Sequence, residues 1–467
     1  MKILNLIKSK ISNKDKILIL GFGKEGISTY KVIRKIFLFK KIFIADFNKK
    51  IEPFFNKNFF DKNVVFFLGE NYLKEISNFD IIFKSPGISL KNIKINEKKI
   101  LTQTQLFFEI YKEKIIGITG TKGKSTTSQL TFNIFKNYFS DVLLVGNIGI
   151  PVFDVLNKIT DKTIFIYELS SHQLEFVENS PKYSILLNIY KEHLDFYKSY
   201  LEYQNAKFNI FKFQKKFDFS IYYADNEIIK NRISNFIKAE NKYSFTTENN
   251  FSKKNAYFKE KKIYLKINTE LKKFKTSDIK IPGIHNIKNV MASLIISKIF
   301  NIPYEIIKKE IKSFSGLPHR LEYFGKFNEI SFYNDSISTI PESTIAAILS
   351  IKRVNSIIIG GMDRGIDYSN LINFLKNSEI ENIIFIDETG KKLYSEMKQK
   401  FIKNKFLYMS DNLKKCVEIA FKKTKKNHNV LFSPGASSYN MFKNFEERGN
   451  VFKNTVKNLA FFEKKIF

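Results

Sequence analysis

The chain of 467 residues has no tryptophan, one cysteine and five histidines. The single cysteine, Cys416, cannot form an internal disulfide, and no Cys/His cluster has the spacing of zinc ligands. No uncharged apolar run reaches the roughly 18 residues that a membrane-spanning helix needs. Lysines lie throughout the N-terminal segment, which has no small-residue cleavage site. We therefore expect a cytoplasmic protein without stable membrane insertion.

Acidic residues are fewer than basic ones: the chain has 46 Asp and Glu but 78 Lys and Arg, and its formal net charge is +32. Such a positive field attracts polyphosphates and nucleic acids. However, most of the basic residues are lysines scattered along every segment, and they accompany an excess of Ile, Phe and Asn. We interpret the charge as solvated surface in a compositionally biased chain, and we expect a monomer without a nucleic-acid partner.

The most informative segment, residues 117–127, reads GITGTKGKSTT and follows an apolar run typical of a buried strand. Its glycines let backbone N–H groups turn toward phosphate oxygens, and the following residues have helical spacing. Lys124 is expected to reach the β- and γ-phosphates of ATP, and the hydroxyl of Ser125 or Thr126 to hold Mg²⁺. The predicted ATP-binding residues of this turn are Gly120, Thr121, Gly123, Lys124, Ser125 and Thr126.

A second glycine-rich turn, GFGKEG at residues 21–26, follows the first apolar strand, and Asp46 ends the next strand. This pattern predicts a phosphate-bearing ligand on the helix that follows the turn, without choosing between a nicotinamide dinucleotide and a UDP-sugar. Gly23 and Asp46 are its candidate ligand-binding residues. Ser85, in the turn SPG after another strand, is a further candidate, although a structural turn explains the same residues.

At about 150 residues a domain, the length predicts roughly three domains, and short apolar strands alternate with helical patterns along most of the chain. We predict strands at residues 16–21, 41–46, 64–68 and 81–85, then at 142–145, 163–167 and 183–188, and finally at 331–334, 356–360, 382–386 and 429–432. Helical spacing begins at about Gly26 and again at 283–300, and 316–320 (GLPHR) is predicted as a linker. Polar segments GNIG, ELSS and EHLD follow the three middle strands, where an open α/β sheet binds ligands.

The segments TGTKGKST, GNIG, ELSSHQLE, EHLD, YQNAKFNIF, GIHNIKNVMAS, GLPHRLE, NDS and SPGASSYNMFKNFEERG follow one another in the order found in the Mur ligases. The chain resembles that family over nearly its whole length, and its two ends are most similar to the glutamate-adding branch. The resemblance implies an N-terminal Rossmann-like UDP-binding domain at 1–103, a central P-loop ATPase-type parallel sheet at 104–316 and a C-terminal Rossmann-like domain at 317–467. It also implies ATP-dependent addition of glutamate to UDP-N-acetylmuramoyl-L-alanine through an acyl phosphate, in peptidoglycan precursor synthesis.

The resemblance assigns a role to further residues. Glu168 and His193 match ligands of two Mg²⁺ ions, and Lys207 matches a lysine that is often carbamylated and then binds metal. Together with Lys124 and Arg320, these are the candidate catalytic residues. Those that match the far side of the ATP site are Asn286, Asn289, Arg320 and Asp335. Those that match contacts to the muramoyl-alanine part are Asn147, Ser170 and Ser171, whereas Ser438 and Phe445 match the glutamate pocket.

Two positions depart from the family pattern. Ile337 stands where a lysine is usual, and Arg364 stands where a lysine grips the side-chain carboxylate of the amino acid. An arginine can bind that carboxylate through two hydrogen bonds, although with a different reach. D-glutamate is the expected amino acid, with L-glutamate as the alternative that these departures leave open. A folylpolyglutamate-synthase-like ligase shares the ATPase core but would lack the N-terminal GFGKEG domain.

Overall fold

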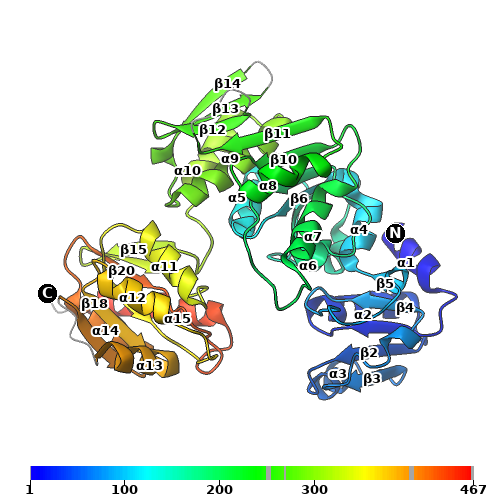
Figure 1. Cartoon of the computed structure of the whole chain (residues 1–467), viewed down its shortest axis with the longest axis horizontal. Coiled ribbons are helices and arrows are strands. Elements are labelled where there is room, and N and C mark those ends of the chain that lie inside the picture. Colours follow the sequence, from blue (N-terminus) through cyan, green and yellow to red (C-terminus); the bar gives the residue numbers. More distant parts are fainter. Residues whose placement is uncertain (1, 249–253, 268–269, 399–403, 464–467) are drawn as a thin grey trace. The chain divides into compact units, whose positions relative to one another are not determined.

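The computed structural model describes residues 2–248, 254–267, 270–398 and 404–463, and shows an α/β chain with three sheets (Figure 1). The chain forms two compact units, one of residues Met1–Asp278 with Ile284–Lys312, the other of Ile279–Gly283 with Ser313–Phe467. Among the described residues, no helix is both long enough and apolar enough to span a bilayer. The α/β class predicted from the sequence is confirmed, whereas the predicted domain boundaries stay predictions.

The first sheet has the order β3-β2-β1-β4-β5, and all its strands are parallel. The strands are β1 (Ile17–Leu20), β2 (Ile42–Asp46), β3 (Val64–Leu68), β4 (Ile81–Lys84) and β5 (Ile100–Leu101); the helices are α1 (Lys2–Ile11), α2 (Lys24–Ile36) and α3 (Ile51–Asn58). The order reverses between β1 and β4, which is where doubly wound sheets bind ligands. The predicted strands are confirmed, but α2 begins at Lys24, two residues earlier than predicted, and α1 was not predicted.

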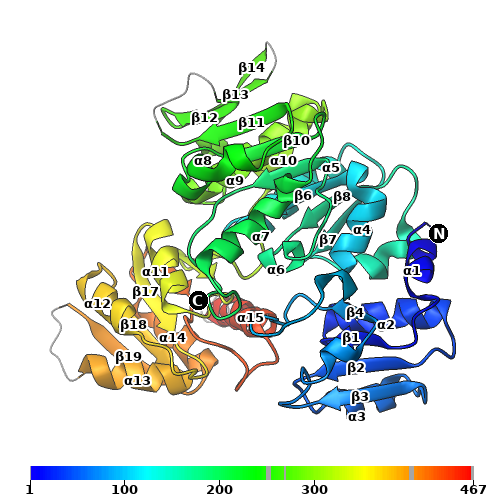
Figure 2. The same ribbon diagram turned by 45° about the vertical axis from the view of Figure 1, so that its right-hand side comes forward.

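The second sheet has nine strands in the order β14-β13-β12-β11-β10-β9-β6-β8-β7. Its parallel strands are β6 (Ile115–Thr119), β7 (Val142–Gly146), β8 (Ile164–Glu168), β9 (Tyr183–Leu186), β10 (Phe219–Tyr223), β11 (Asn241–Thr246) and β12 (Ala256–Lys259); β13 (Lys262–Ile267) and β14 (Glu270–Lys275) add an antiparallel edge. Figure 2 shows β6, β8 and β7 side by side, at the opposite end of this sheet from β13 and β14.

The helices of the second sheet are α4 (Gln103–Tyr111), α5 (Lys124–Lys136), α6 (Ser171–Leu174), α7 (Tyr200–Lys212), α8 (Glu227–Arg232), α9 (Ile284–Ile299) and α10 (Tyr304–Ser313). α5 packs against α9, where Thr131 Oγ1 lies 3.0 Å from Ser293 Oγ. β6 is fully buried because helices cover both faces of the sheet, as the continuous apolar run of this strand predicts.

The third sheet, in the second compact unit, has the order β15-β16-β20-β17-β18-β19. Its strands are β15 (Glu322–Phe327), β16 (Ile330–Asn334), β17 (Val354–Ile359), β18 (Asn382–Ile386), β19 (Phe406–Ser410) and β20 (Asn429–Phe432); its helices are α11 (Pro341–Ser350), α12 (Ser369–Asn377), α13 (Asp387–Lys398), α14 (Leu413–Lys423) and α15 (Phe445–Glu463). β15 is antiparallel and the others are parallel. β16, β20 and β17 are neighbours, so the segments after them lie at one edge of the sheet.

Candidate active site

The predicted phosphate-binding turn connects β6 to α5. Gly123 is the N-cap of α5 with a φ of 87°, and Gly120 has a φ of 159°. A Cβ on Gly123 would lie 2.3 Å from Asn289 Oδ1, so the turn requires glycine both for its backbone angle and for the close approach of α9. Gly123 has no side chain to cap the helix, which leaves the first N–H groups of α5 free of a capping side chain, as an anion site needs.

Lys124 lies folded over this turn, where its Nζ donates to the carbonyl oxygens of Gly120 at 2.9 Å and Thr121 at 3.0 Å. Thr121 is itself held from α7, since its Oγ1 lies 2.7 Å from the hydroxyl of Tyr203. Of the two candidate hydroxyl ligands, Ser125 is partly exposed and Thr126 is buried. Ser125 is therefore the more accessible of the two to an ion bound outside the turn.

Glu168 ends β8 as a fully buried carboxylate. Its Oε1 accepts a hydrogen bond from Asn147 Nδ2 at 2.7 Å, and the Asn147 N–H donates to the Glu168 carbonyl at 3.0 Å. Its Oε2 is buried and has no hydrogen-bond partner among the residues that the structure describes. A buried oxygen without a partner is costly unless a ligand satisfies it, and a carboxylate oxygen is a ligand that Mg²⁺ prefers. Glu168 therefore fits a magnesium ligand.

Lys207, on α7, donates from Nζ to the Gly120 carbonyl at 2.9 Å, the same oxygen that Lys124 contacts. Its side chain is buried, and burial, together with the nearby Lys124, holds the pKa of the Lys207 ammonium well below its usual range. The structure thus brings Lys207 to the phosphate-binding turn. The lowered pKa enlarges the fraction of neutral amine, which is the form that reacts with carbon dioxide in carbamylation.

His193 follows β9 in a left-handed conformation with a φ of 58°. Its ring centroid lies 4.8 Å from that of His172 on α6 and 5.9 Å from that of Tyr203. Burial lowers the pKa of His193, which favours the neutral imidazole that a metal ion needs. Within the described ranges, no three His, Cys, Asp or Glu side chains are grouped to hold an ion on their own. Mg²⁺ commonly takes one or two carboxylates and completes its shell with water and substrate phosphates, so this finding is compatible with the predicted ions.

Asn286 and Asn289 lie on α9, where Asn289 Nδ2 donates to Asn286 Oδ1 at 3.1 Å. Both side chains are buried, and Asn289 lies against Gly123 of the phosphate-binding turn. Asn289, which is separated from this turn by more than 150 positions, therefore lies beside it, and Asn286 is held against Asn289.

Ser170 and Ser171 begin α6. Ser170 is the N-cap, since its Oγ accepts from the Gln173 N–H at 3.2 Å, while Gln173 Oε1 accepts from the Ser170 N–H at 3.1 Å. This reciprocal capping box fixes the start of a helix of only four residues. Gln173, which sequence reasoning did not single out, lies in the same ELSSHQLE segment.

The GFGKEG turn follows β1 at the reversal of the first sheet. Asp46 Oδ2 accepts from the Phe22 N–H at 2.7 Å, and Ser85 Oγ donates to the Gly21 carbonyl at 2.7 Å. Both candidates therefore hold the turn itself. A Cβ on Gly23 would meet no atom within 4 Å, so the turn is open at this residue. A hollow of about 280 Å³ is lined by Ala45, the residue before Asp46, and by Phe67, Tyr72 and Phe79 among others.

In the second unit, Asp335 follows β16 and is almost fully buried. Its oxygens accept from the Leu321 N–H at 3.1 Å and the Ser433 hydroxyl at 2.8 Å, and also from the Ser338 hydroxyl. Burial raises the pKa of Asp335 to about 6, although these hydrogen bonds and Arg320 lower it in part. Asp335 thus fixes the segment that carries Arg320. Ile337 lies in the same region, since its N–H donates to the His319 carbonyl at 3.1 Å.

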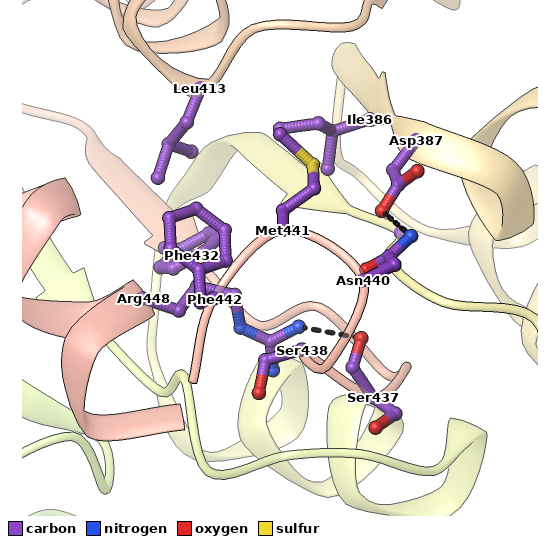
Figure 3. Close-up of a pocket in the computed structure, with 12 residues that line it drawn as sticks. Ile386, Asp387, Leu413, Phe432, Ser437, Ser438, Asn440, Met441, Phe442 and Arg448 are labelled. Atoms are coloured by element: carbon purple, nitrogen blue, oxygen red, sulfur yellow. Dashed lines mark hydrogen bonds between the residues drawn. The ribbon is translucent and has the colours of Figure 1, made fainter. Parts of the chain in front are cut away.

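Three further predicted residues lie on neighbouring segments of the second unit. Arg364 is exposed on the segment after β17, and Met362 forms a bridge with Ser437 on the segment after β20. Ser438 is buried and lines a small cavity with Arg448 (Figure 3). Phe445 begins α15, and its carbonyl accepts from the Ser336 hydroxyl at 2.9 Å.

Arg448, which sequence reasoning missed, connects these segments. Its guanidinium donates to the carbonyl oxygens of Ser336 at 2.8 Å and Ala436 at 3.0 Å. It also donates to the carbonyl oxygen of Ser437 at 3.1 Å, the bond that Figure 3 shows. Burial lowers the pKa of Arg448 to about 10, which leaves it charged at neutral pH. The only signal for it in the sequence is its place in the FEERG motif.

Comparisons with known proteins agree with this arrangement. The family model of the Mur ligase middle domain matches residues 118–297. The chain is 32% identical over 453 residues to a UDP-N-acetylmuramoylalanine–D-glutamate ligase of Clostridioides difficile, covering 95% of this chain and 98% of that protein. It is 31% identical over 471 residues to a protein of the same name from Acetivibrio thermocellus, covering 98% and 99%.

Solved structures share the fold at lower identity. The MurF ligase of Thermotoga maritima in complex with ADP is similar with a TM-score of 0.55 at 18% identity, covering 83% of this chain and 90% of that one. The UDP-N-acetylmuramate-alanine ligase MurC of the same organism has a TM-score of 0.56 at 16% identity, covering 95% and 99%. The resemblance read from the sequence motifs is thus confirmed, and the chain belongs to the Mur ligase family of ATP-dependent ligases.

Proposed function

We propose that the chain joins D-glutamate to UDP-N-acetylmuramoyl-L-alanine, coupled to the cleavage of ATP into ADP and phosphate. The observation that carries the proposal is its similarity, over almost the whole length, to relatives named for this reaction. The same similarity supports a place in peptidoglycan precursor synthesis. With ATP as a substrate, we place the reaction in the cytoplasm, and we propose that the chain acts as a monomer.

The chemistry requires an activated carboxyl group, because a carboxylate is a poor acyl donor. The carboxylate of the alanine attacks the γ-phosphorus of ATP, ADP leaves, and an acyl phosphate forms. The amine of glutamate then attacks the acyl carbon, the amide bond forms, and phosphate leaves. Charge on the transferring phosphoryl group is the main obstacle, so the protein must supply positive charge and N–H donors at fixed positions.

Lys124 and the N–H groups of the turn at Gly120–Gly123 supply that charge in our proposal. The ammonium of Lys124 already lies over the turn, and it moves from the carbonyls of Gly120 and Thr121 to the β- and γ-phosphates when ATP binds. Asn289 lies against the same turn, Asn286 is hydrogen-bonded to Asn289, and the two hold the nucleotide from α9. By their match to the family pattern, Arg320 and Asp335 are also proposed as ATP-binding residues, and Asp335 fixes the segment that carries Arg320.

Glu168 and Ser125 are the residues that would hold one Mg²⁺ ion, and His193 with carbamylated Lys207 would hold a second. Bound there, magnesium neutralises charge on the phosphate and acyl oxygens. The buried, unpartnered Oε2 of Glu168 supports the first assignment. Asn147 orients this carboxylate through its 2.7 Å hydrogen bond to Oε1.

The nucleotide-sugar substrate is proposed to bind the first sheet at the GFGKEG turn. Its diphosphate lies at the N-terminus of α2, near Gly23 and the turn of Ser85, and the aromatic-lined hollow at Ala45 suits a pyrimidine base. Ser170 and Ser171 hold the muramoyl-alanine end. For glutamate, we propose Arg364, Ser438 and Phe445, with the guanidinium of Arg364 on the side-chain carboxylate.

The test is the release of ADP by purified protein with Mg²⁺, ATP and UDP-N-acetylmuramoyl-L-alanine. We expect turnover with D-glutamate and background release with L-glutamate or without an amino acid. Turnover with L-glutamate alone would instead indicate that Ile337 and Arg364 accompany a changed specificity for the glutamate enantiomer. Absence of turnover with either enantiomer would contradict the proposed function.

A further inference from the structure

Two contacts connect the ligand-binding turns of the first sheet with α6 of the second. Glu25, in the first turn of α2, accepts a hydrogen bond on Oε1 from Gln173 Nε2 at 2.8 Å. Lys84, at the end of β4, forms an ion pair with Glu175 Oε2 at 3.2 Å. Gln173 lies on α6 and Glu175 is its C-cap residue. The short helix that begins at Ser170 and Ser171 is therefore held by side chains from both sides of the reversal between β1 and β4.

Both the oxygen and the nitrogen of the Gln173 side-chain amide form hydrogen bonds. Its Oε1 accepts from the Ser170 N–H, and its Nε2 donates to Glu25. The opposite orientation would place an NH₂ group against an N–H and an oxygen against a carboxylate, so only one orientation satisfies both neighbours. A change in the position or charge of the Glu25 carboxyl therefore affects Ser170 through the side chain of Gln173.

The surroundings of Glu25 oppose its negative charge. Burial raises the pKa of Glu25 to about 6, and the hydrogen bond from Gln173 and the charge of Lys84 lower it only in part. Lys84 faces it from β4 and is paired with Glu175, Tyr167 faces it from β8, and the neighbouring Lys24 is exposed. Gln103, on α4, donates to the backbone carbonyl of Glu25 and adds no charge.

The GFGKEG turn brings further negative charge to the same place. Gly23 is the N-cap of α2, directly before Lys24 and Glu25, and the turn is open at Gly23. A diphosphate bound there carries two negative charges within about one helical turn of the Glu25 carboxylate. Like charges at that separation disfavour each other, so the diphosphate favours the neutral carboxyl.

We propose that Glu25 is a positioning residue for the sugar-nucleotide substrate and that it takes up a proton from solvent when the diphosphate binds. The neutral carboxyl keeps its carbonyl oxygen on Gln173 Nε2 and gains an O–H that can donate to a phosphate oxygen. Gln173 then holds Ser170 at the start of α6, so occupation of the first sheet fixes the residues that meet the muramoyl-alanine end. This inference rests on the proposed function.

The test compares the wild type with Glu25→Gln and Glu25→Ala, with ADP release as the readout and ATP and D-glutamate saturating. In the wild type, the KM for UDP-N-acetylmuramoyl-L-alanine should be constant below pH 6 and rise above it, by at most tenfold per pH unit. The phosphates of a nucleotide sugar do not titrate in this range. In Glu25→Gln, whose neutral amide oxygen still accepts from Gln173, the KM should stay low and flat between pH 5.5 and 8.5. In Glu25→Ala it should be high at every pH.

Titration calorimetry gives a second readout. At pH 7.5, binding in two buffers of different ionisation enthalpy should show uptake of about one proton by the wild type and none by Glu25→Gln. Glu52→Gln is the matched control, because Glu52 is an exposed first-turn glutamate on α3 of the same sheet. It should behave as the wild type in both measurements.

Three outcomes would overturn the inference. A pH dependence that persists in Glu25→Gln would assign the proton to another group, and a KM of Glu25→Gln as high as that of Glu25→Ala would mean that the charged carboxylate is needed. In both cases the wild type turns over and the proposed function stands. A wild type that does not turn over would contradict the proposed function and this inference together.

Discussion

At the scale of single residues, Lys207 is buried, whereas Lys212, the other lysine of α7, is exposed. The Nζ of Lys207 is buried against the Gly120 carbonyl, and its pKa is lowered, first by burial and then by Lys124. Above that lowered pKa the amine is neutral and nucleophilic. We predict that it reacts with carbon dioxide, so that ¹³C-bicarbonate gives a carbamate carbon signal in NMR spectra at pH 8.

Lys207→Arg should remove this signal and lower ADP release by about 100-fold, because a guanidinium keeps its charge and cannot become a carboxylate-like ligand. The matched control is Lys212→Arg, since Lys212 is exposed at the end of the same helix. That variant should retain both the signal and the rate. A carbamate signal that persists in Lys207→Arg would exclude Lys207 as its source.

At the scale of elements, the junction of β6 with α5 depends on the absence of a side chain at one position. Gly123→Ala places a Cβ 2.3 Å from Asn289 Oδ1 and imposes a φ of 87° on a residue that disfavours it. The backbone strain alone costs about 1–2 kcal/mol, which corresponds to roughly 5- to 30-fold in an equilibrium constant, and the contact with Asn289 adds to it. We predict that the KM for ATP rises by at least tenfold, measured by ADP release.

Gly87→Ala is the control for this substitution, because a Cβ there would meet no atom within 4 Å and the glycine does not have a positive φ. Its KM for ATP should be that of the wild type. Circular dichroism should show that both variants are folded. An unchanged KM for ATP in folded Gly123→Ala would show that the turn at Gly123 does not hold the nucleotide.

Sequence reasoning predicted those elements whose pattern of residues is contained in one short segment of the chain. The buried strands of the three sheets are short apolar runs, and the turn before α5 has glycines at the required positions. β15 was missed because it lies at an edge of the third sheet, where partial burial allows polar residues to interrupt its apolar pattern. β19 (FLYMS), at the other edge, is apolar but short and was not predicted either. α1 is amphipathic, but the lysines spread through it obscured its helical pattern, and no helix was predicted there.

The contacts of the site were predictable only in part. The family motifs located Lys124, Glu168 and Lys207, but nothing local indicates that Lys124 and Lys207 share the Gly120 carbonyl. Arg448 contacts Ser336 across 112 positions, and Gln173 contacts Glu25 across 148. Such pairs depend on how the sheets bring distant segments together, and a single sequence does not encode that pairing in any periodic pattern.

At the scale of the whole molecule, the phosphate-binding turn and the α9 residues proposed for ATP lie in one compact unit, and the residues proposed for glutamate lie in the other, together with Arg320 and Asp335. Lys124, Asn286 and Asn289 lie in the first unit, whereas Arg364 and Ser438 lie in the second. A substitution in one set should therefore change the KM for one substrate. We predict that Arg364→Ala raises the KM for D-glutamate by about 100-fold, because it removes a charged hydrogen-bond pair, and changes the KM for ATP by less than about twofold.

Arg364→Lys should recover part of the glutamate affinity, since it restores the charge without the second hydrogen bond. Arg353→Ala is the control, because Arg353 is an exposed arginine before β17 in the same unit. It should leave both KM values unchanged, and Gly123→Ala should show the reverse pattern from Arg364→Ala. If Arg364→Ala raised both KM values equally, the assignment of Arg364 to the glutamate pocket alone would be wrong.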